Sequence, residues 1–300
     1  MYFNVREKSF PDGLIQATRY DRYRYKGKRR NLKKRGGPAM HGSGTTIERK
    51  EWENMKRARQ VVWDLARANK FEWWVTLTFA EEHVDNRYDY LCCADAMKTF
   101  TKYLGKHHCS WLFVPDQHED GAIHFHGLVA GSLKLTRAIN PHTGKPLFDN
   151  HGRPCYNIDN YRFGFTSAVP LDGSDAVVGY LASYYTKNRK MIVPKGCKRY
   201  WASRNLARPE VSYGEQDIMS FLRSRFVGAE YTKTIHSCFG KSIFVQTTEE
   251  QIAAQVEQWG KQTEADAAPQ ETYWREEWDG TYPTQQNKEN IEVPDVFDFD

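Results

Sequence analysis

Two histidines separated by one phenylalanine, His124 and His126, stand in an apolar-rich run of the sequence. Side chains alternate between the two faces of a β-strand, so both imidazoles would lie on the same face if this run is a strand. Two imidazoles on one face can bind a single metal ion. The alternative is a pair of strand histidines that face water or the core, and the neighbouring residues must decide between the two.

A third ligand is predicted from the hairpin that these histidines would occupy. The runs 110–116 and 122–130 are rich in apolar residues, and Glu119-Asp120-Gly121 between them is typical of a turn. A three-residue loop pairs residue 118 with 122, which places Asp116 opposite His124 on the same face.

Two other residues compete for that position. A two-residue turn would shift the register and put Gln117 opposite His124, and His118 is a further, weaker candidate. We expect Asp116, because a carboxylate with two imidazoles suits Mg²⁺ or Mn²⁺ and leaves coordination positions open for a substrate oxygen. A solvated turn carboxylate is the alternative for Asp116.

A second group with chemical potential is Tyr180, Tyr184 and Lys187 in a helix predicted from Ser174 onward. Residues three and four apart lie on one side of a helix, so both hydroxyls can reach the same place. A phenol with a pKa of about 10 is a poor nucleophile at neutral pH, but an adjacent ammonium and a metal that polarises a phosphate would help it attack. Tyrosines that only pack in the core are the alternative.

Basic residues interleaved with aromatic ones occur in two places, residues 18–35 and residues 199–204. This composition suits a partner with phosphates and stackable bases, and single-stranded nucleic acid is the natural candidate. In the second segment we expect Arg199, Trp201 and Arg204 to contact DNA. A solvated surface with a few core aromatics is the alternative for either segment alone.

The net charge of +5 over 300 residues hides a basic beginning and an acidic end. We therefore expect four parts: a basic, flexible arm over 1–44, the main domain over 45–215, a small α/β extension over 216–260 and an acidic disordered tail over 261–300. No apolar run approaches the ~20 residues that span a bilayer, and no apolar signal core is present at the N-terminus, so we expect a soluble, intracellular protein.

Periodicity and turn residues predict the order of elements. The expected elements are a helix over 45–69, a strand over 71–79, a helix over 89–104 that stops at Gly105, the hairpin, a surface loop over 131–160, a strand over 161–169, the tyrosine helix, and a strand, strand, helix set over 226–259. The six cysteines form no Cys-x-x-Cys pair, so free thiols are expected.

Taken in order, these motifs resemble the HUH (His-hydrophobic-His) endonucleases that initiate rolling-circle replication in small single-stranded DNA phages and plasmids, in particular microvirus-like and filamentous-phage-like initiators. The segments that carry the likeness are Phe71 to Phe79, Val114 to Leu128, Gly179 to Lys187 with its two tyrosines, and Arg199 to Pro209. Two departures from the family pattern are Asp116, where Glu is common, and Ser183, where a lysine often precedes the second tyrosine.

The resemblance implies an α+β fold: a central antiparallel sheet of about five strands with helices packed chiefly on one face, the HUH palm, which is RRM-like. It also implies an endonuclease and nucleotidyltransferase activity. Tyr180 or Tyr184 would attack single-stranded origin DNA, form a 5′-phosphotyrosine link, free a 3′-OH primer and later rejoin the strand. A host helicase and polymerase would be partners, no membrane would be involved, and the bacterial host cytoplasm would be the location.

Two other functions stay open on the sequence alone. An HUH transposase or relaxase would use the same chemistry, although the chain lacks a helicase segment. A noncatalytic protein that binds single-stranded nucleic acid would use His124, Tyr180 and Tyr184 only for packing and stacking.

Overall fold

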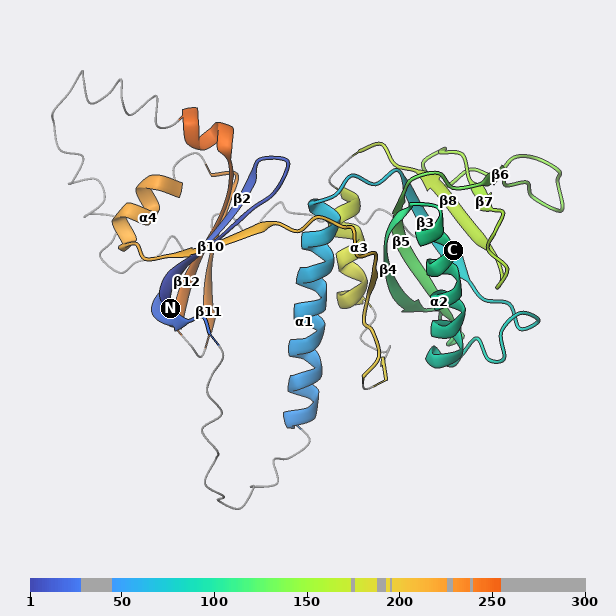
Figure 1. Cartoon of the computed structure of the whole chain (residues 1–300), viewed down its shortest axis with the longest axis horizontal. Coiled ribbons are helices and arrows are strands. Elements are labelled where there is room, and N and C mark those ends of the chain that lie inside the picture. The colour runs from blue at the N-terminus through green and yellow to red at the C-terminus, as the bar shows by residue number, and fades with distance from the viewer. Residues whose placement is uncertain are drawn as a thin grey trace, which may run out of the picture. The chain divides into compact units, whose positions relative to one another are not determined.

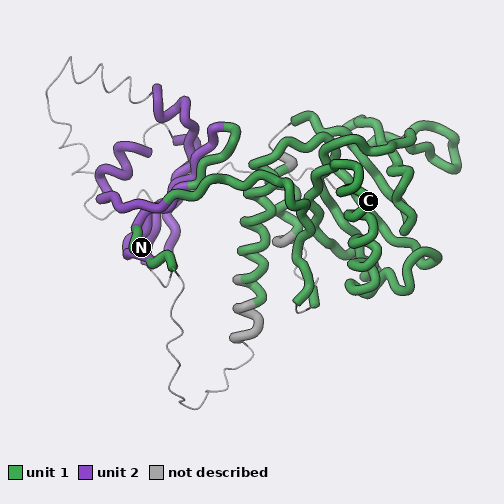
Figure 2. Tube along the Cα trace, viewed as in Figure 1, with its two compact units in different colours: residues 1–3, 8–12, 25–212 green, residues 4–7, 13–24, 213–300 purple. Residues whose placement is uncertain are grey.

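The computed structural model describes residues 1–27, 45–173, 176–187, 193–194, 196–225, 229–237 and 240–254. The chain divides into two compact units, coloured separately in Figure 2. The first unit comprises residues 1–3, 8–12 and 25–212, and the second comprises residues 4–7, 13–24 and those from 213 onward. The structure contains a seven-stranded and a five-stranded sheet, both antiparallel, with helices packed on them, which confirms the predicted α+β class.

The seven-stranded sheet belongs to the first unit and has the order β6-β7-β8-β3-β5-β4-β9. Its strands are β3 (Trp73–Thr78), β4 (Ser110–Gln117), β5 (Ile123–Ala130), β6 (Leu135–Arg137), β7 (Tyr156–Ile158), β8 (Thr166–Pro170) and β9 (Trp201–Ala202). The helices of this unit are α1 (Thr45–Arg67), α2 (Tyr90–Lys106) and α3 (Ala176–Lys187). The strand β5, which carries the two histidines, lies between β3 and β4.

Helices cover both faces of this sheet, so the expectation of helices chiefly on one face is wrong (Figure 1). On one face, Met97 and Phe100 of α2 pack against a cluster that includes Val75 of β3. On the other face, Leu65 of α1 and Leu181 of α3 pack in a second cluster. The physical reason is that the central strands are apolar on both sides, and such strands need a cover on each face.

The termini of several predicted elements differ from those observed. Residues 131–160 are not a structureless loop, because β6 and β7 form within them. The strand predicted over 161–169 begins only at Thr166. Gly105 does not stop α2, which continues to Lys106; a Cβ at Gly105 would lie 3.4 Å from the Trp111 ring, an ordinary packing distance.

The N-terminal segment is a pair of strands and not a flexible arm. The strands β1 (Tyr2–Ser9) and β2 (Leu14–Tyr25) belong to the five-stranded sheet, whose order is β10-β1-β2-β12-β11. The sequence signal that escaped prediction is the turn Pro11-Asp12-Gly13 between apolar runs, with Gly13 at φ 84°. Residues 28–44, the remainder of the expected arm, lie outside the described residues.

The remaining elements of that sheet are β10 (Glu210–Gly214), β11 (Tyr231–Ser237) and β12 (Gly240–Thr248), with the helix α4 (Ile218–Arg225). The two strands of the predicted strand, strand, helix set are therefore present, whereas β10 and α4 were not predicted. Residues 249–254 are helical, and Thr248 and Gln251 exchange side chain to backbone hydrogen bonds of 3.0 and 3.2 Å, the predicted capping box. The acidic segment 261–300 lies outside the described residues.

Candidate metal and tyrosine site

The register of the β4-β5 hairpin is the one that the three-residue loop predicts. Asp116 pairs with His124, and the His118 amide donates to the Ala122 carbonyl at 2.9 Å. Gly121 closes the turn at φ 92°, a conformation that favours glycine. Gln117 pairs with Ile123, and its side-chain amide donates to the Gly121 carbonyl. The alternative in which Gln117 stands opposite His124 is therefore wrong.

Asp116, His124 and His126 form the metal-ligand cluster, with ligand atoms that lie within 4.8 Å of one another. The Asp116 Oδ2 atom is 3.4 Å from His124 Nε2 and 3.7 Å from His126 Nε2, and the two Nε2 atoms are 2.8 Å apart. Asp116 and His124 are buried, at 7% and 4% exposure. Three buried donor atoms that converge on one point meet the basic requirement for binding a divalent ion.

The chemistry of the donor set also fits a metal ion. The Oγ1 atom of Thr76 lies 3.1 Å from His126 Nδ1, and a hydroxyl there can accept the Nδ1 proton and leave the Nε2 lone pair directed at the cluster. Burial lowers the pKa of His126 to about 3, so this imidazole is neutral at physiological pH and able to bind a metal. His126 and Asp116 are thus prepared as ligands.

His118 lies against the cluster without being part of it. Its ring centroid is 3.9 Å from that of His124, and burial lowers its pKa. Among the described residues, the group that could hold an ion consists of Asp116, His124 and His126 alone. Asp116 is the third residue of this group, as expected, and His118 is a neighbour that contacts one of the histidines.

The helix α3 places both tyrosines against the metal-ligand cluster. The rings of Tyr184 and His126 are stacked, with centroids 4.3 Å apart and planes 24° apart. The Tyr184 hydroxyl donates to the Tyr180 hydroxyl at 2.7 Å. Leu181, on the same helix, is fully buried and fixes the rotation of α3. The two hydroxyls therefore meet, as their spacing of four residues predicts.

Trp74 of β3 connects the tyrosines and the histidine. Its ring centroid lies 5.1 Å from Tyr180, 6.3 Å from Tyr184 and 5.8 Å from His126. Burial raises the pKa of Tyr184 well above its usual range, and the hydrogen bond to Tyr180 acts in the same direction. Lys187 is the last residue of α3, but its side chain lies outside the described residues.

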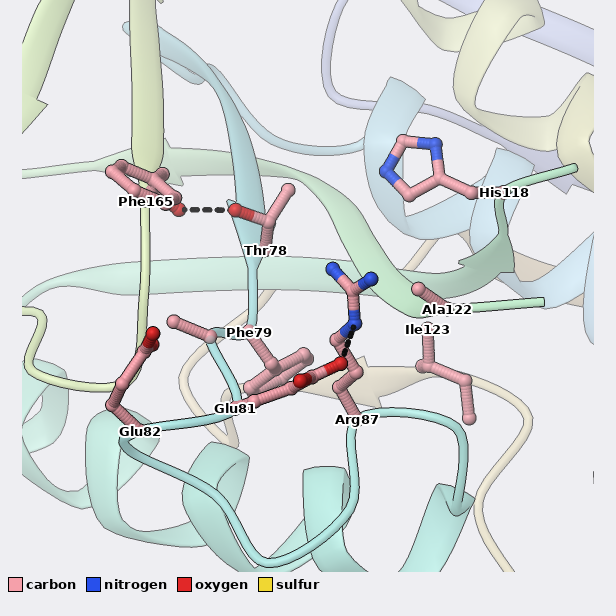
Figure 3. Close-up of a pocket in the computed structure, with 10 residues that line it drawn as sticks. Thr78, Phe79, Glu81, Glu82, Arg87, His118, Ala122, Ile123 and Phe165 are labelled. Carbon is pink, nitrogen blue, oxygen red and sulfur yellow. Dashed lines mark hydrogen bonds and ion pairs between the residues drawn. The ribbon is translucent and has the colours of Figure 1, made fainter. Parts of the chain in front are cut away.

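A cavity of about 420 Å³ adjoins the metal-ligand cluster through His118 (Figure 3). Phe165 and Thr78 line it on one side and Arg87 on the other, and the Arg87 guanidinium is paired with Glu81 at 3.2 Å. The Thr78 hydroxyl donates to the Phe165 carbonyl at 3.1 Å, while the Phe165 side chain is 78% exposed. An exposed aromatic ring and a cation thus stand beside the candidate metal site.

The three residues expected to contact DNA lie in different environments. Trp201 is a core residue: it is 5% exposed, packs near Phe125, and donates through Nε1 to the Tyr90 hydroxyl. Its ring is therefore not available for stacking on a base. Arg199 is half-buried and paired with Glu51 of α1, whereas Arg204 is exposed. Of the three, only Arg204 is placed as a surface cation.

Comparison with known families agrees with the position of this site. Residues 72–189 match a family model described as replication-associated protein, of the ORF2 type. This span is less than half of the chain, and it includes β3, the histidine hairpin and α3. The match supports a role in replication. Searches of curated proteins and of solved structures found no significant match. Among the described residues, no helix is long and apolar enough to cross a membrane.

Sequence reasoning missed Trp74 and Thr76 as parts of the site. Both lie in the run that was interpreted only as a buried strand. In the structure Thr76 pairs with His126, and Trp74 is two residues away on the same face. The alternation within β3 was readable, but the pairing of β3 with β5 was needed to show which of its faces carries the histidines.

Proposed function

We propose that the chain is a replication initiator that cuts single-stranded DNA by tyrosine transesterification. The observation that carries this proposal is the stacking of Tyr184 on His126, 4.3 Å between centroids, with the Tyr180 hydroxyl in hydrogen-bond contact. It brings two candidate nucleophiles to a buried cluster of metal ligands. The family match over residues 72–189 supports the replication role.

Asp116, His124 and His126 would hold a divalent ion, Mg²⁺ or Mn²⁺, and the ion would polarise the phosphate that is attacked. Tyr180 would be the first nucleophile. The hydrogen bond that Tyr184 donates stabilises negative charge on the Tyr180 oxygen, whereas Tyr184 itself is buried and holds its proton. The unequal environments of the two phenols thus favour an order of use.

In the proposed step the Tyr180 oxygen forms a bond to phosphorus, and the bond from phosphorus to the 3′ oxygen of the preceding nucleotide breaks. The proton that the tyrosine loses balances the proton that the departing 3′ oxygen gains. The products are a 5′-phosphotyrosine and a free 3′-OH, which a host polymerase extends. Tyr184 would attack at the end of a round, and the released 3′-OH would close the circle by the reverse reaction.

The single strand would enter beside the cavity next to His118. Phe165 offers an exposed ring for stacking on a base, and exposed Arg204 offers a phosphate contact elsewhere on the unit. Arg199 would act by positioning, because it is paired with Glu51. The bacterial cytoplasm as the location and a host helicase as a partner follow from the same proposal.

The test uses a random-sequence 60-nucleotide single-stranded DNA library, because the origin sequence is unknown. The protein is incubated with the library and Mn²⁺, and covalent species are captured under denaturing conditions. We expect an adduct that requires the metal and enriches one sequence. The Tyr180→Phe/Tyr184→Phe double variant should give no adduct. Tyr156→Phe is the matched control, since Tyr156 lies on β7 and packs against Trp73, outside the site.

The two rival functions predict other results in this assay. A transposase or relaxase would form the same adduct but should select a transposon-end or transfer-origin sequence outside the chain's own replicon. A noncatalytic binding protein would retain DNA under native conditions and lose it entirely under denaturing conditions. The second outcome, or an adduct that survives in the double variant, would contradict the proposed mechanism.

A further inference from the structure

The second unit has a sheet with two unlike faces. The strand β12 pairs with β2 on one side and with β11 on the other, and residues directly opposite each other share a face. One face is a core: Ala17 and Val245, which pair with each other, pack with Phe221 and Leu222 of α4. The opposite face carries the residues that precede and follow these along each strand.

Three aromatic residues cross this opposite face on a diagonal. Phe244 pairs with Thr18, two residues before Tyr20, and Tyr231 pairs with Gln246, two residues after Phe244. The Tyr231 and Phe244 ring centroids are 6.2 Å apart, and Tyr231 is 39% exposed. Diagonal neighbours on a sheet are separated by roughly 7–8 Å. Each ring can therefore meet a different base of an extended strand.

Cations accompany the aromatic rings. Arg22, Arg24 and Lys233 are exposed, and the guanidinium of Arg24 lies 3.9 Å above the Tyr20 ring. Lys233 pairs with Phe244, so its ammonium group stands on the same face. We call this surface the aromatic-basic face; its residues are Thr18, Tyr20, Arg22, Arg24, Tyr231, Lys233, Ile235, Ser242, Phe244 and Gln246. None of these ten residues is acidic.

The composition of the face selects among partners. An apolar protein segment would bury Arg22, Arg24 and Lys233 without counter-charges, which is costly. Duplex nucleic acid satisfies cations with phosphates but keeps its base faces stacked inside. Unpaired nucleotides offer both a phosphate for each cation and a free π-face for each ring.

We propose that the aromatic-basic face is a binding surface for single-stranded nucleic acid, separate from the metal and tyrosine site. Tyr20, Phe244 and Tyr231 would each stack on one base, and Arg22, Arg24 and Lys233 would bind the phosphates between them. This surface belongs to the second unit, outside the span that matches the replication-associated family. It does not depend on the proposed nuclease mechanism.

The first experiment locates the strand by crosslinking. The full chain is mixed with a 20-nucleotide oligothymidine that contains 5-bromouracil, in EDTA so that no cutting occurs, and is irradiated and digested. We expect crosslinked peptides that contain Tyr231 or Phe244. Crosslinks confined to peptides within residues 72–189 would overturn the proposal. If crosslinks to this face appear only after residues 262–300 are deleted, the acidic segment is its occupant and the proposal is wrong.

The second experiment measures affinity by fluorescence anisotropy with labelled oligothymidine, again in EDTA. Loss of one stacked base costs about five- to a hundredfold in affinity, so Tyr231→Leu and Phe244→Leu should each weaken binding at least fivefold. The Arg22→Ala/Arg24→Ala double variant should reduce the slope of log affinity against log salt by about 1.4. Arg223→Ala, an exposed arginine on α4, is the matched control and should leave both unchanged.

Thermal unfolding of each variant separates lost binding from lost folding. Unchanged affinity in a folded Tyr231→Leu variant, together with an unchanged salt slope in the double arginine variant, would overturn the proposal. The adduct assay with Mn²⁺ is run in parallel on the same variants. Failure of that assay in the wild-type chain contradicts the nuclease mechanism, whereas failure of the crosslink contradicts only the aromatic-basic face.

Discussion

The ring of Tyr184 lies on the ring of His126, 4.3 Å between centroids, so the tyrosine helix and the histidine strand meet at one point. The contact is possible because β3 and β5 place Trp74, Thr76 and His126 on the face that α3 covers. Everything that the site could do depends on this packing of one helix against two neighbouring strands.

The two tyrosines should differ when each is replaced alone. Tyr180→Phe removes the proposed first nucleophile and should lower adduct formation by a hundredfold or more. Tyr184→Phe removes the hydrogen bond to Tyr180 and should lower the rate by about tenfold, because one such bond contributes roughly 1–1.5 kcal/mol. The rate is read on a denaturing gel over time with the selected DNA strand. Equal losses in the two variants, or a larger loss for Tyr184→Phe, would contradict the proposed order.

Metal affinity should depend on Asp116. Replacing its carboxylate in Asp116→Asn removes the charged ligand, and we expect Mn²⁺ affinity to fall at least tenfold by titration calorimetry. Asp116→Glu restores the charge and should recover part of the affinity. Gln117→Glu is the control, since that side chain contacts the Gly121 carbonyl on the hairpin turn. If Asp116→Asn binds Mn²⁺ as the wild type does, another residue completes the cluster.

The hydroxyl of Thr76 should tune the same site without binding the ion. Thr76→Val keeps the shape of the side chain but removes the partner of His126 Nδ1. Loss of such a partner typically weakens metal affinity by about 10–100-fold. The control Thr136→Val lies on β6 and is exposed. A Thr76→Val protein with wild-type Mn²⁺ affinity would show that the hydroxyl does not orient the imidazole.

Gly127 should be required for stability of the sheet that carries the histidines. A Cβ there would lie 2.1 Å from Phe113 Cδ1 and 2.6 Å from the Leu112 carbonyl oxygen, and Phe113 is fully buried. Gly127→Ala should therefore lower the free energy of unfolding by about 1–3 kcal/mol. Gly179→Ala in α3 meets nothing within 4 Å and should be neutral or slightly stabilising. Urea unfolding of both variants checks the contrast.

Alkaline pH should destabilise the core around Trp201 through Tyr90. Burial raises the pKa of Tyr90 to about 12, so the folded state holds a proton that the unfolded state loses above about pH 10. This contribution to stability is present below pH 10 and is lost as the pH rises from 10 to 12. The loss should reach about 1.4 kcal/mol by pH 11.

Urea unfolding at pH 9 and pH 11 measures this loss. In Tyr90→Phe the decrease between the two values should be smaller by about the same amount, about 1.4 kcal/mol. Tyr88→Phe, an exposed neighbour, should behave as the wild type. If Tyr90→Phe loses as much stability as the wild type over this interval, the phenol is not buried against Trp201.

Local patterns predicted the chemistry of the site better than its surroundings. Alternation along one strand and spacing along one helix were sufficient to place His124 with His126 and Tyr180 with Tyr184. The opposition of Asp116 and His124 followed from the turn residues. Trp74, Thr76 and the core position of Trp201 depend on which strands pair across the sheet, and no local pattern carries that information. The hairpin of β1 and β2 was missed because its basic, tyrosine-rich composition outweighed the turn that joins its strands.

The central claim is that a tyrosine of α3 becomes covalently bound to DNA at the metal-ligand cluster. The most direct test is mass spectrometry of the captured adduct after nuclease and protease digestion. We predict a single peptide that spans Tyr180 and Tyr184, heavier by a 5′-phosphorylated nucleotide on Tyr180, formed with Mn²⁺ and absent in EDTA. A phosphonucleotide on any residue outside α3, or an equal yield in EDTA, would contradict the account.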